Sequence, residues 1–136
     1  MNKIGIISGD IYCIGRIQTA LKSSDIKEAV EVHVGPGESI ECVLRKICDC
    51  DVVFLGHEMP RFTGEDIAIS LSENVRIISI AKEPVLAMEY ADAYLPKEEI
   101  PCYPEHESHD LFESREDYWL RKRSVMRILV GEEVET

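Results

Sequence analysis

The stretch from Asp51 to Gly64, DVVFLGHEMPRFTG, contains a strand, a loop and the beginning of a helix. The segment 52–56 is apolar throughout, which is typical of a strand buried on both faces of a parallel sheet. Met59-Pro60 then forms a loop, and Thr63 can cap a helix in a capping box with Asp66. In an open α/β sheet, ligands and chemistry lie outside the carboxyl end of such a strand.

The rest of the chain alternates in the same way between short apolar runs and segments of helical periodicity. Asp10 is a good N-cap, the residues from Ser39 onward have the clearest helical spacing, and Gly131 can close the final helix. This order predicts one domain over 1–136 with the flavodoxin-like fold, a doubly wound five-stranded parallel sheet in a three-layer sandwich. The expected strands are 3–7, 30–34, 52–56, 75–80 and one within 91–97, and the expected helices are 11–22, 39–47, 63–72, 84–90 and 115–130.

Composition limits the possible classes of function. At 136 residues the chain can bury a core, and its net charge of −11 argues against nucleic acid or an anionic membrane surface as a partner. No apolar run is long enough to span a membrane, and the N-terminus lacks the apolar core of a signal peptide. The five cysteines are odd in number and scattered, as expected of free thiols. We therefore expect a cytoplasmic protein.

Two motifs resemble the receiver domains of two-component response regulators. Met59-Pro60 and Gly64 match the loop after the third strand of that family, with the same spacing from proline to glycine. In the fifth strand, Tyr94 and Lys97 match its aromatic switch residue and its phosphoryl-pairing lysine. The resemblance covers nearly the whole chain outside 98–114.

The resemblance also implies that the reaction of that family is missing here. The phosphoacceptor aspartate lies four residues before the proline, at Gly56, and glycine has no side chain to accept a phosphoryl group. The other positions of this degenerate phosphorylation site carry Ser8 and Gly9 in place of the acidic pair, and Ile80 in place of the hydroxyl. Asp10 lies one residue late, and a single carboxylate is a poor cage for Mg²⁺. Lys97 is expected to pair with Asp10 or Glu58, or to be solvated.

The resemblance implies a pseudo-receiver, a non-enzymatic protein-interaction module that needs no phosphorylation and no cofactor. Its partner surface would include Tyr94 and the final helix, where Arg121 and Lys122 belong to a basic cluster. The same face, together with the fourth helix, could form a homodimer. Alternatively, the cluster only neutralises the acidic loop before it and favours the helix C-terminus. The buried side of this helix is expected to carry Tyr118, Val125, Ile128 and Leu129.

The segment 98–114 departs from the receiver pattern as an acidic insertion before the last helix. Its two prolines and high charge predict a loop. Cys102, His106 and His109 have zinc-like spacing, but a fourth ligand is missing and a solvated loop is the simpler interpretation.

Two other functions are open at this stage. The segment 9–15 resembles the cobalamin-binding signature Asp-x-His-x-x-Gly, with Asp10 and Gly15 in place and Tyr12 where the cobalt-ligating histidine would lie. An enzyme could in principle use Asp10, His57 and Glu58 as an acid–base or metal site. No recognisable nucleophile or phosphate-binding loop accompanies them.

Overall fold

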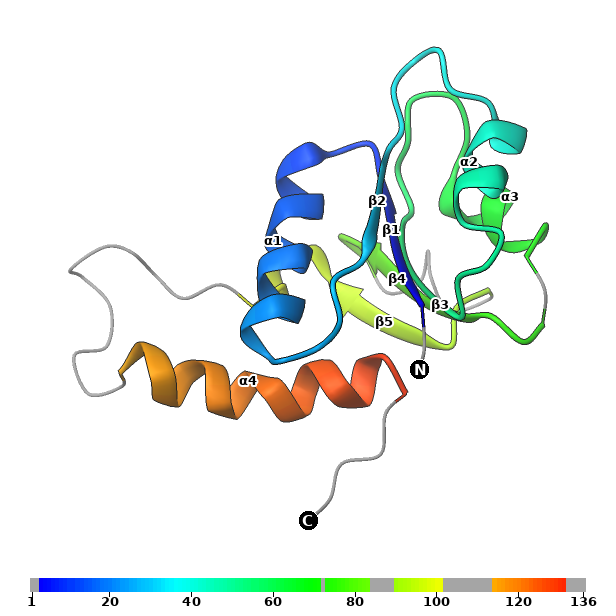
Figure 1. The fold of residues 1–136 in the computed structure, drawn as a ribbon. Helices are drawn as coiled ribbons and strands as arrows, with labels where there is room; N and C mark the ends of the chain where they lie inside the picture. Colours follow the sequence, from blue (N-terminus) through cyan, green and yellow to red (C-terminus); the bar gives the residue numbers. More distant parts are fainter. Residues whose placement is uncertain (1–2, 72, 84–89, 102–113, 132–136) are drawn as a thin grey trace.

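The computed structural model describes residues 3–71, 73–83, 90–101 and 114–131 (Figure 1). Strands and helices alternate along most of the chain, as the sequence pattern predicts. The elements are β1 (Ile4–Ser8), α1 (Ile11–Ser23), β2 (Val30–His33), α2 (Ile40–Lys46), β3 (Val52–Gly56), α3 (Gly64–Ala68), β4 (Arg76–Ala81), β5 (Ala93–Pro96), a 3₁₀ helix (Lys97–Glu99) and α4 (Arg115–Leu129).

The five strands form one parallel sheet in the order β2-β1-β3-β4-β5. This confirms the predicted doubly wound, flavodoxin-like architecture. The order reverses at β1, so β1 and β3 are neighbours and their carboxyl ends form a crevice, which is where such sheets bind ligands. The register pairs Ile7 with Leu55 and Gly56 with Ile80. Ser8, Gly56 and Ile80 therefore lie along the same edge of the sheet.

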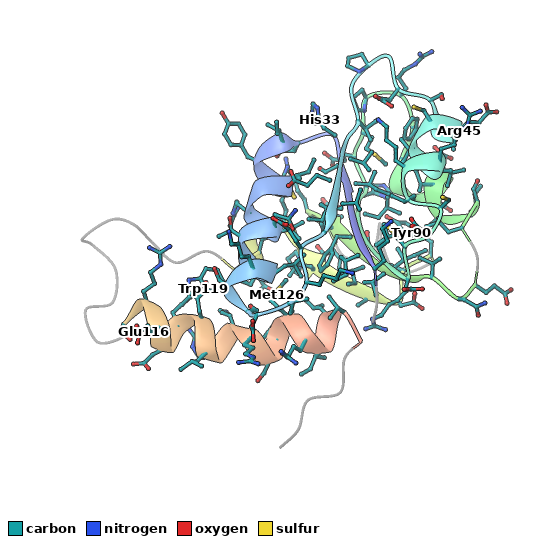
Figure 2. The ribbon with its side chains drawn as sticks, in the orientation of Figure 1. His33, Arg45, Tyr90, Glu116, Trp119 and Met126 are labelled. Atoms are coloured by element: carbon teal, nitrogen blue, oxygen red, sulfur yellow. The ribbon has the colours of Figure 1, made fainter. Side chains whose placement is uncertain are left out.

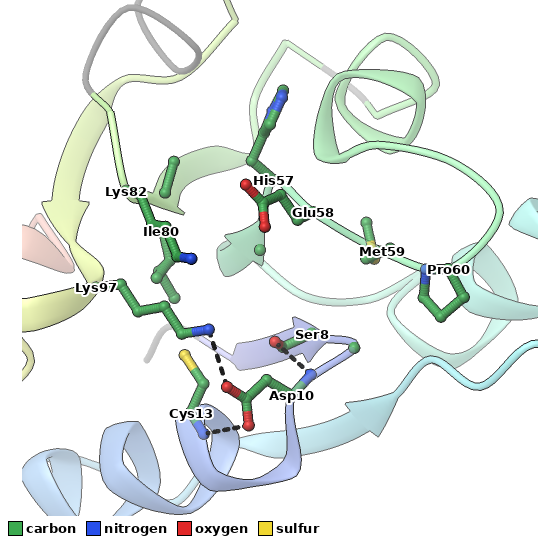
Figure 3. Close-up of a pocket in the computed structure, with 13 residues that line it drawn as sticks. Ser8, Asp10, Cys13, His57, Glu58, Met59, Pro60, Ile80, Lys82 and Lys97 are labelled. Carbon is green, nitrogen blue, oxygen red and sulfur yellow. Dashed lines mark hydrogen bonds and ion pairs between the residues drawn. The ribbon is translucent and has the colours of Figure 1, made fainter.

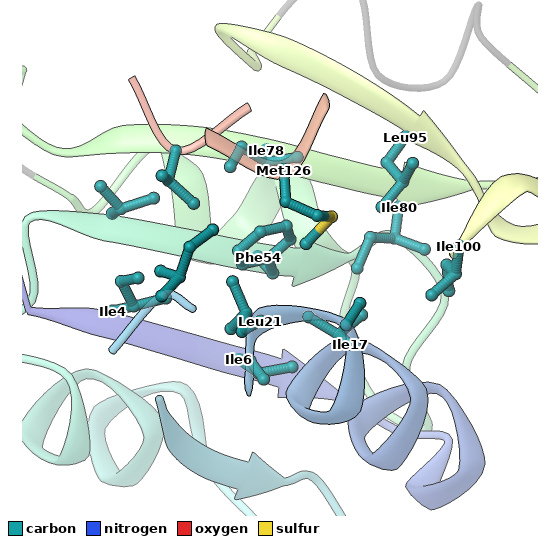
Figure 4. Packing of buried hydrophobic residues seen from close by; sticks show 14 of the residues in the cluster. Ile4, Ile6, Ile17, Leu21, Phe54, Ile78, Ile80, Leu95, Ile100 and Met126 are labelled. Atoms are coloured by element: carbon teal, nitrogen blue, oxygen red, sulfur yellow. The ribbon is translucent and has the colours of Figure 1, made fainter. Parts of the chain in front are cut away.

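One face of the sheet is covered by α1 and α4 (Figure 1). Phe54, Ile6 and Ile78 point into this layer from the three central strands, and Leu21 and Met126 meet them from the two helices (Figure 4). These side chains are almost completely buried. The other face packs against α2 and α3, through Val43, Ile47 and Ile67 among others.

The caps predicted at Asp10, Thr63 and Gly131 form, and Ser39 provides a further one. Asp10 accepts hydrogen bonds from the first turn of α1, Ser39 caps α2, and the Thr63 N–H donates to the Asp66 carboxylate at 2.9 Å. Gly131 follows α4 with φ of +81°, the left-handed conformation that favours glycine. Side-chain caps thus fix where three of these helices begin, and the backbone conformation of Gly131 fixes where α4 ends.

The predicted buried face of α4 is only partly right. Trp119, Met126 and Val130 are buried, whereas Val125 and Ile128 are exposed. Tyr118 and Leu129 lie at the margin of the core. Apolar residues occur on several sides of this helix, so the side that packs is decided by the fit to α1 and the sheet.

The third helix is also shorter than predicted, because α3 ends at Ala68. The N–H groups of Ser70 and Leu71 donate to the carbonyls three residues earlier, at 3.0 and 3.1 Å. The chain therefore tightens into turns of the 3₁₀ type, which still brings Leu71 to the core.

Several predictions fall outside the described residues, namely most of the 84–90 helix, most of the 98–114 loop, and Cys102, His106 and His109. The cysteines that the structure does describe, Cys13, Cys42, Cys48 and Cys50, are free thiols. No helix among the described residues is long and apolar enough to cross a membrane.

Candidate functional site

A cavity of about 310 Å³ opens at the carboxyl ends of β1, β3 and β4 (Figure 3). All six residues predicted for the degenerate phosphorylation site line it, so the fold brings together positions that are far apart in sequence. They are Ser8, Gly9, Asp10, Gly56, Ile80 and Lys97. The cavity also includes residues that the sequence did not assign to the site. Among them, Cys13 and Lys82 have ionisable side chains and were not candidates for any predicted site.

An ion pair between Lys97 and Asp10 crosses the mouth of the cavity. Lys97 Nζ lies 2.9 Å from one carboxylate oxygen of Asp10 (Figure 3). The other oxygen accepts hydrogen bonds from the Tyr12 and Cys13 N–H groups at 2.9 and 3.4 Å. Ser8 Oγ in turn accepts from the Asp10 N–H at 3.0 Å. Asp10 therefore caps α1 and holds Lys97 at the same time.

These contacts set the charge states of the pair. The hydrogen bond from Lys97 is the main reason that the pKa of Asp10 lies below its ordinary value of 3.8. The same bond raises the pKa of Lys97 above 10.5. Both groups are therefore ionised at neutral pH, and of the two partners predicted for Lys97, Asp10 is the one it binds.

We expect the pKa of Asp10 to rise toward 3.8 in the variant Lys97→Met, because the main cause of its depression is removed. Lys82→Met is the matched control, since Lys82 lines the same cavity and is not a cause of the Asp10 shift. Carboxyl-carbon NMR titration measures the pKa directly. An unchanged Asp10 pKa in Lys97→Met would contradict the assignment.

The shifted pKa values of Asp10 and Lys97 determine the pH range in which the ion pair stabilises the fold. Because the folded pKa of Asp10 is lowered, its contribution is present above pH 3.8 and is lost as the pH falls through the folded value. Because that of Lys97 is raised, its contribution is present below pH 10.5 and is lost as the pH rises through the folded value. The side chains of Lys97 and Asp10 are 39% and 37% exposed, so water screens the ion pair and its effect on stability is small.

There is little space beside Gly56 at the base of the cavity. A Cβ built on Gly56 would lie 3.2 Å from Ser8 Oγ and 3.4 Å from the Ile7 carbonyl oxygen. Ile80 lines the same cavity and presents only methyl and methylene groups. An aspartate at position 56 would therefore fit only if Ser8 moved.

His57 and Tyr90 form a second polar cluster beside the cavity. The Tyr90 hydroxyl lies 2.9 Å from His57 Nδ1 and 2.8 Å from Ser79 Oγ, and the two rings stack. Ser79 is fully buried on the α2/α3 side of the sheet, so it faces away from the cavity as the strand alternation predicts. Sequence reasoning missed Tyr90, because its partners are a histidine and a serine on two other elements.

The residues of the alternative enzyme site, Asp10, His57 and Glu58, do line one cavity. However, Asp10 is held by Lys97, and His57 Nδ1 is engaged by Tyr90. Burial raises the pKa of the Cys13 thiol, which keeps it protonated and a poor nucleophile at neutral pH. Among the described residues, no group of three or more His, Cys, Asp or Glu side chains is arranged to hold a metal ion.

The remaining predicted positions lie on other surfaces. Tyr12 is exposed on α1 beside the cavity. Tyr94 lies on the edge strand β5, and its hydroxyl donates to the Ala81 carbonyl at 2.7 Å. Arg121 and Lys122 lie over the ring of Tyr118, at 5.4 and 5.7 Å from its centroid.

No protein-family model matches the chain, and no curated protein matches it. Solved receiver domains match its fold. The signal receiver domain of the putative response regulator NarL from Mycobacterium tuberculosis has 16% identity and a TM-score of 0.59, covering 96% of this chain and 98% of its own. The REC domain of AraT from Geobacillus stearothermophilus has 18% identity and a TM-score of 0.59, covering 94% and 92%.

The response regulator Rcp1 in its Mn²⁺-bound form has 10% identity and a TM-score of 0.60, covering 100% of this chain and 99% of its own. These similarities extend over the full domain, although the identities are low. They confirm that the chain has the receiver fold.

Proposed function

We propose that this protein is a pseudo-receiver, a signalling module with the receiver fold that acts through protein contacts without phosphorylation. The receiver fold supports the signalling role. The observation that carries the proposal is Gly56, at the carboxyl end of the central strand, where the receiver loop places its phosphoacceptor.

The surroundings of Gly56 support the same proposal. Receiver chemistry needs a carboxylate to accept the phosphoryl group, and acidic side chains to hold a divalent cation. Here Ser8 and Gly9 occupy the positions of the acidic pair, and Ile80 lacks the hydroxyl that would follow the phosphoryl group. Lys97 has a protein carboxylate as its partner, and that carboxylate already caps a helix. The site thus retains Lys97, and the Asp10 carboxylate neutralises its charge.

We expect the intact mass of the purified protein to be unchanged after incubation with acetyl phosphate and Mg²⁺. The reason is that Gly56 offers no oxygen nucleophile. A receiver domain that retains its phosphoacceptor, treated in parallel, should gain the mass of one phosphoryl group. A stable phosphoryl adduct on this chain would contradict the proposal, and peptide mapping would then locate the acceptor among Asp10, His57 and Glu58.

In this function the protein has no catalytic residue, and its activity depends on surfaces that bind another protein. We assign Tyr94, Arg121 and Lys122 to these surfaces. Tyr94 suits such a role, because an aromatic ring with a hydrogen-bonded hydroxyl on an edge strand presents apolar area with little loss of side-chain freedom. The net charge of −11 favours protein over nucleic acid or an anionic membrane as the partner.

A further inference from the structure

The outer side of α4 carries large apolar side chains that the other described elements do not bury. Leu120, Val125 and Ile128 are 63%, 44% and 61% exposed. On the opposite side of the helix, Trp119 and Met126 are buried toward α1 and the sheet (Figure 2). Single exposed apolar residues are common, but three on one side of one helix indicate a contact surface.

The spacing of these residues suits a second helix. Leu120, Ser124 and Ile128 follow one another at intervals of four, which is the ridge that packs beside the ridge of another helix in the commonest packing class. Ser124 is exposed and small, so it allows another helix to approach closely between its two apolar neighbours. Val125 widens the apolar surface on one side.

The charge of α4 differs in sign from the rest of the chain. Arg115–Leu129 contains five Lys or Arg residues and two acidic residues, a local charge of +3 in a chain of −11, so the remaining residues carry −14. Two of the cations contact the body of the domain: Arg123 lies 3.5 Å from the Asp25 carboxylate, and Arg127 donates to the Asp25 carbonyl at 3.4 Å. Arg121 and Lys122 lie over the Tyr118 ring, and on the helix surface they adjoin Val125, four and three residues further along.

From this combination we propose that the outer face of α4, defined by Leu120, Arg121, Ser124, Val125 and Ile128, binds an acidic amphipathic helix of a partner protein. The inference rests on the proposed function and names the chemistry of its partner. The apolar side of the partner helix would lie over Ser124 between Leu120 and Ile128, and its carboxylates would meet Arg121 and Lys122. A second copy of α4 is less suitable, because it carries the same positive charge.

The probe is a fluorescein-labelled helical peptide of about five turns, with leucines on one side and glutamates flanking them. We expect saturable binding by fluorescence anisotropy. A matched peptide with lysines in place of the glutamates should bind at least about tenfold more weakly. The variants Ile128→Glu and Arg121→Glu should each weaken binding of the acidic peptide by about tenfold or more. The first replaces an apolar contact with a charge that repels the glutamates of the peptide, and the second reverses a cation that would pair with them.

Two variants act as matched controls. Ile69→Glu changes an isoleucine that is 75% exposed just after α3, on the other side of the sheet. Arg45→Glu reverses an exposed charge on α2. Both should leave peptide binding unchanged. Circular dichroism melting of all four variants shows that each is folded before binding is measured.

Three results would overturn the inference. They are the absence of saturable binding of the acidic peptide, equal binding of the lysine peptide, and equal loss of binding in the variants at positions 69 and 128. Tighter binding of a double-stranded oligonucleotide, or self-association abolished by Ile128→Glu, would assign the face to nucleic acid or to a second copy instead. A phosphoryl adduct in the mass experiment would overturn the proposed function while leaving the peptide result intact, so the two failures are distinguishable.

Discussion

The variant Phe54→Ala is expected to lose roughly 3–5 kcal/mol of its free energy of unfolding. Phe54 is fully buried on β3, in the centre of the layer between the sheet and helices α1 and α4 (Figure 4). Its removal costs the transfer free energy of the ring, and it leaves a cavity lined by side chains such as Leu21 and Met126, which are held by separate helices and cannot all move inward.

Guanidinium unfolding followed by tryptophan fluorescence would measure this loss, because Trp119 belongs to the same core. The variant Phe54→Leu should be destabilised much less, since it keeps most of the buried volume. Equal midpoints for Phe54→Ala and the unchanged protein would show that this layer is less tightly packed than the structure indicates.

The variant Gly64→Ala is expected to lose about 1–3 kcal/mol. A Cβ at this position would lie 2.7 Å from the Gly56 carbonyl oxygen and 3.1 Å from both His57 Cα and the Tyr90 hydroxyl. The first contact is with the backbone of the central strand, so a rotamer change cannot relieve it. The Gly64 N–H also donates to the His57 carbonyl at 2.8 Å, which fixes the loop in this position. Close approach of the backbones therefore explains the glycine of the Met-Pro motif.

Gly15→Ala is the matched control for Gly64→Ala, and its effect should have the opposite sign. Gly15 lies inside α1, and a Cβ there would meet no atom within 4 Å. Alanine should stabilise the helix by about 0.5–1 kcal/mol, because glycine has more conformational freedom to lose on folding. The same unfolding curves would measure both variants, and a gain in stability for Gly64→Ala would rule out the contact with the Gly56 carbonyl.

Much of the fold was predictable, because it depends on local signals. The uninterrupted apolar run of β3 marked a strand buried on both faces, and Asp10, Ser39 and Thr63 marked the beginnings of helices. The approach of Lys97 to Asp10 was also among the expected pairings, because parallel strands place their carboxyl ends at one edge of the sheet.

The side of α4 that packs was not predictable from spacing. Tyr118, Val125 and Leu129 have helical spacing, and so do Trp119 and Met126. Periodicity identifies apolar stripes but does not choose between two of them on one helix. The choice depends on tertiary contacts, among them Arg123 and Arg127 at Asp25, which lies just beyond α1.

The polar cluster of His57, Ser79 and Tyr90 could not be predicted from the sequence for a different reason. Each of these residues is individually ordinary in the sequence, and only the sheet and the loop before β5 bring them within hydrogen-bonding distance. Burial raises the pKa of the Tyr90 hydroxyl, so it stays protonated and can donate to one neighbour while it accepts from another.

The contact between Arg76 and the end of α4 has a consequence for the order in which the domain assembles. Arg76 Nε donates to the Leu129 carbonyl at 2.7 Å, across 53 positions of sequence. β4 is synthesised before α4, and Met126 of α4 covers part of the apolar layer around Phe54, so this layer stays partly open in the nascent chain until α4 has emerged. Such exposed surfaces are those that chaperones bind. The domain therefore completes its folding only after the last turn of α4 has emerged.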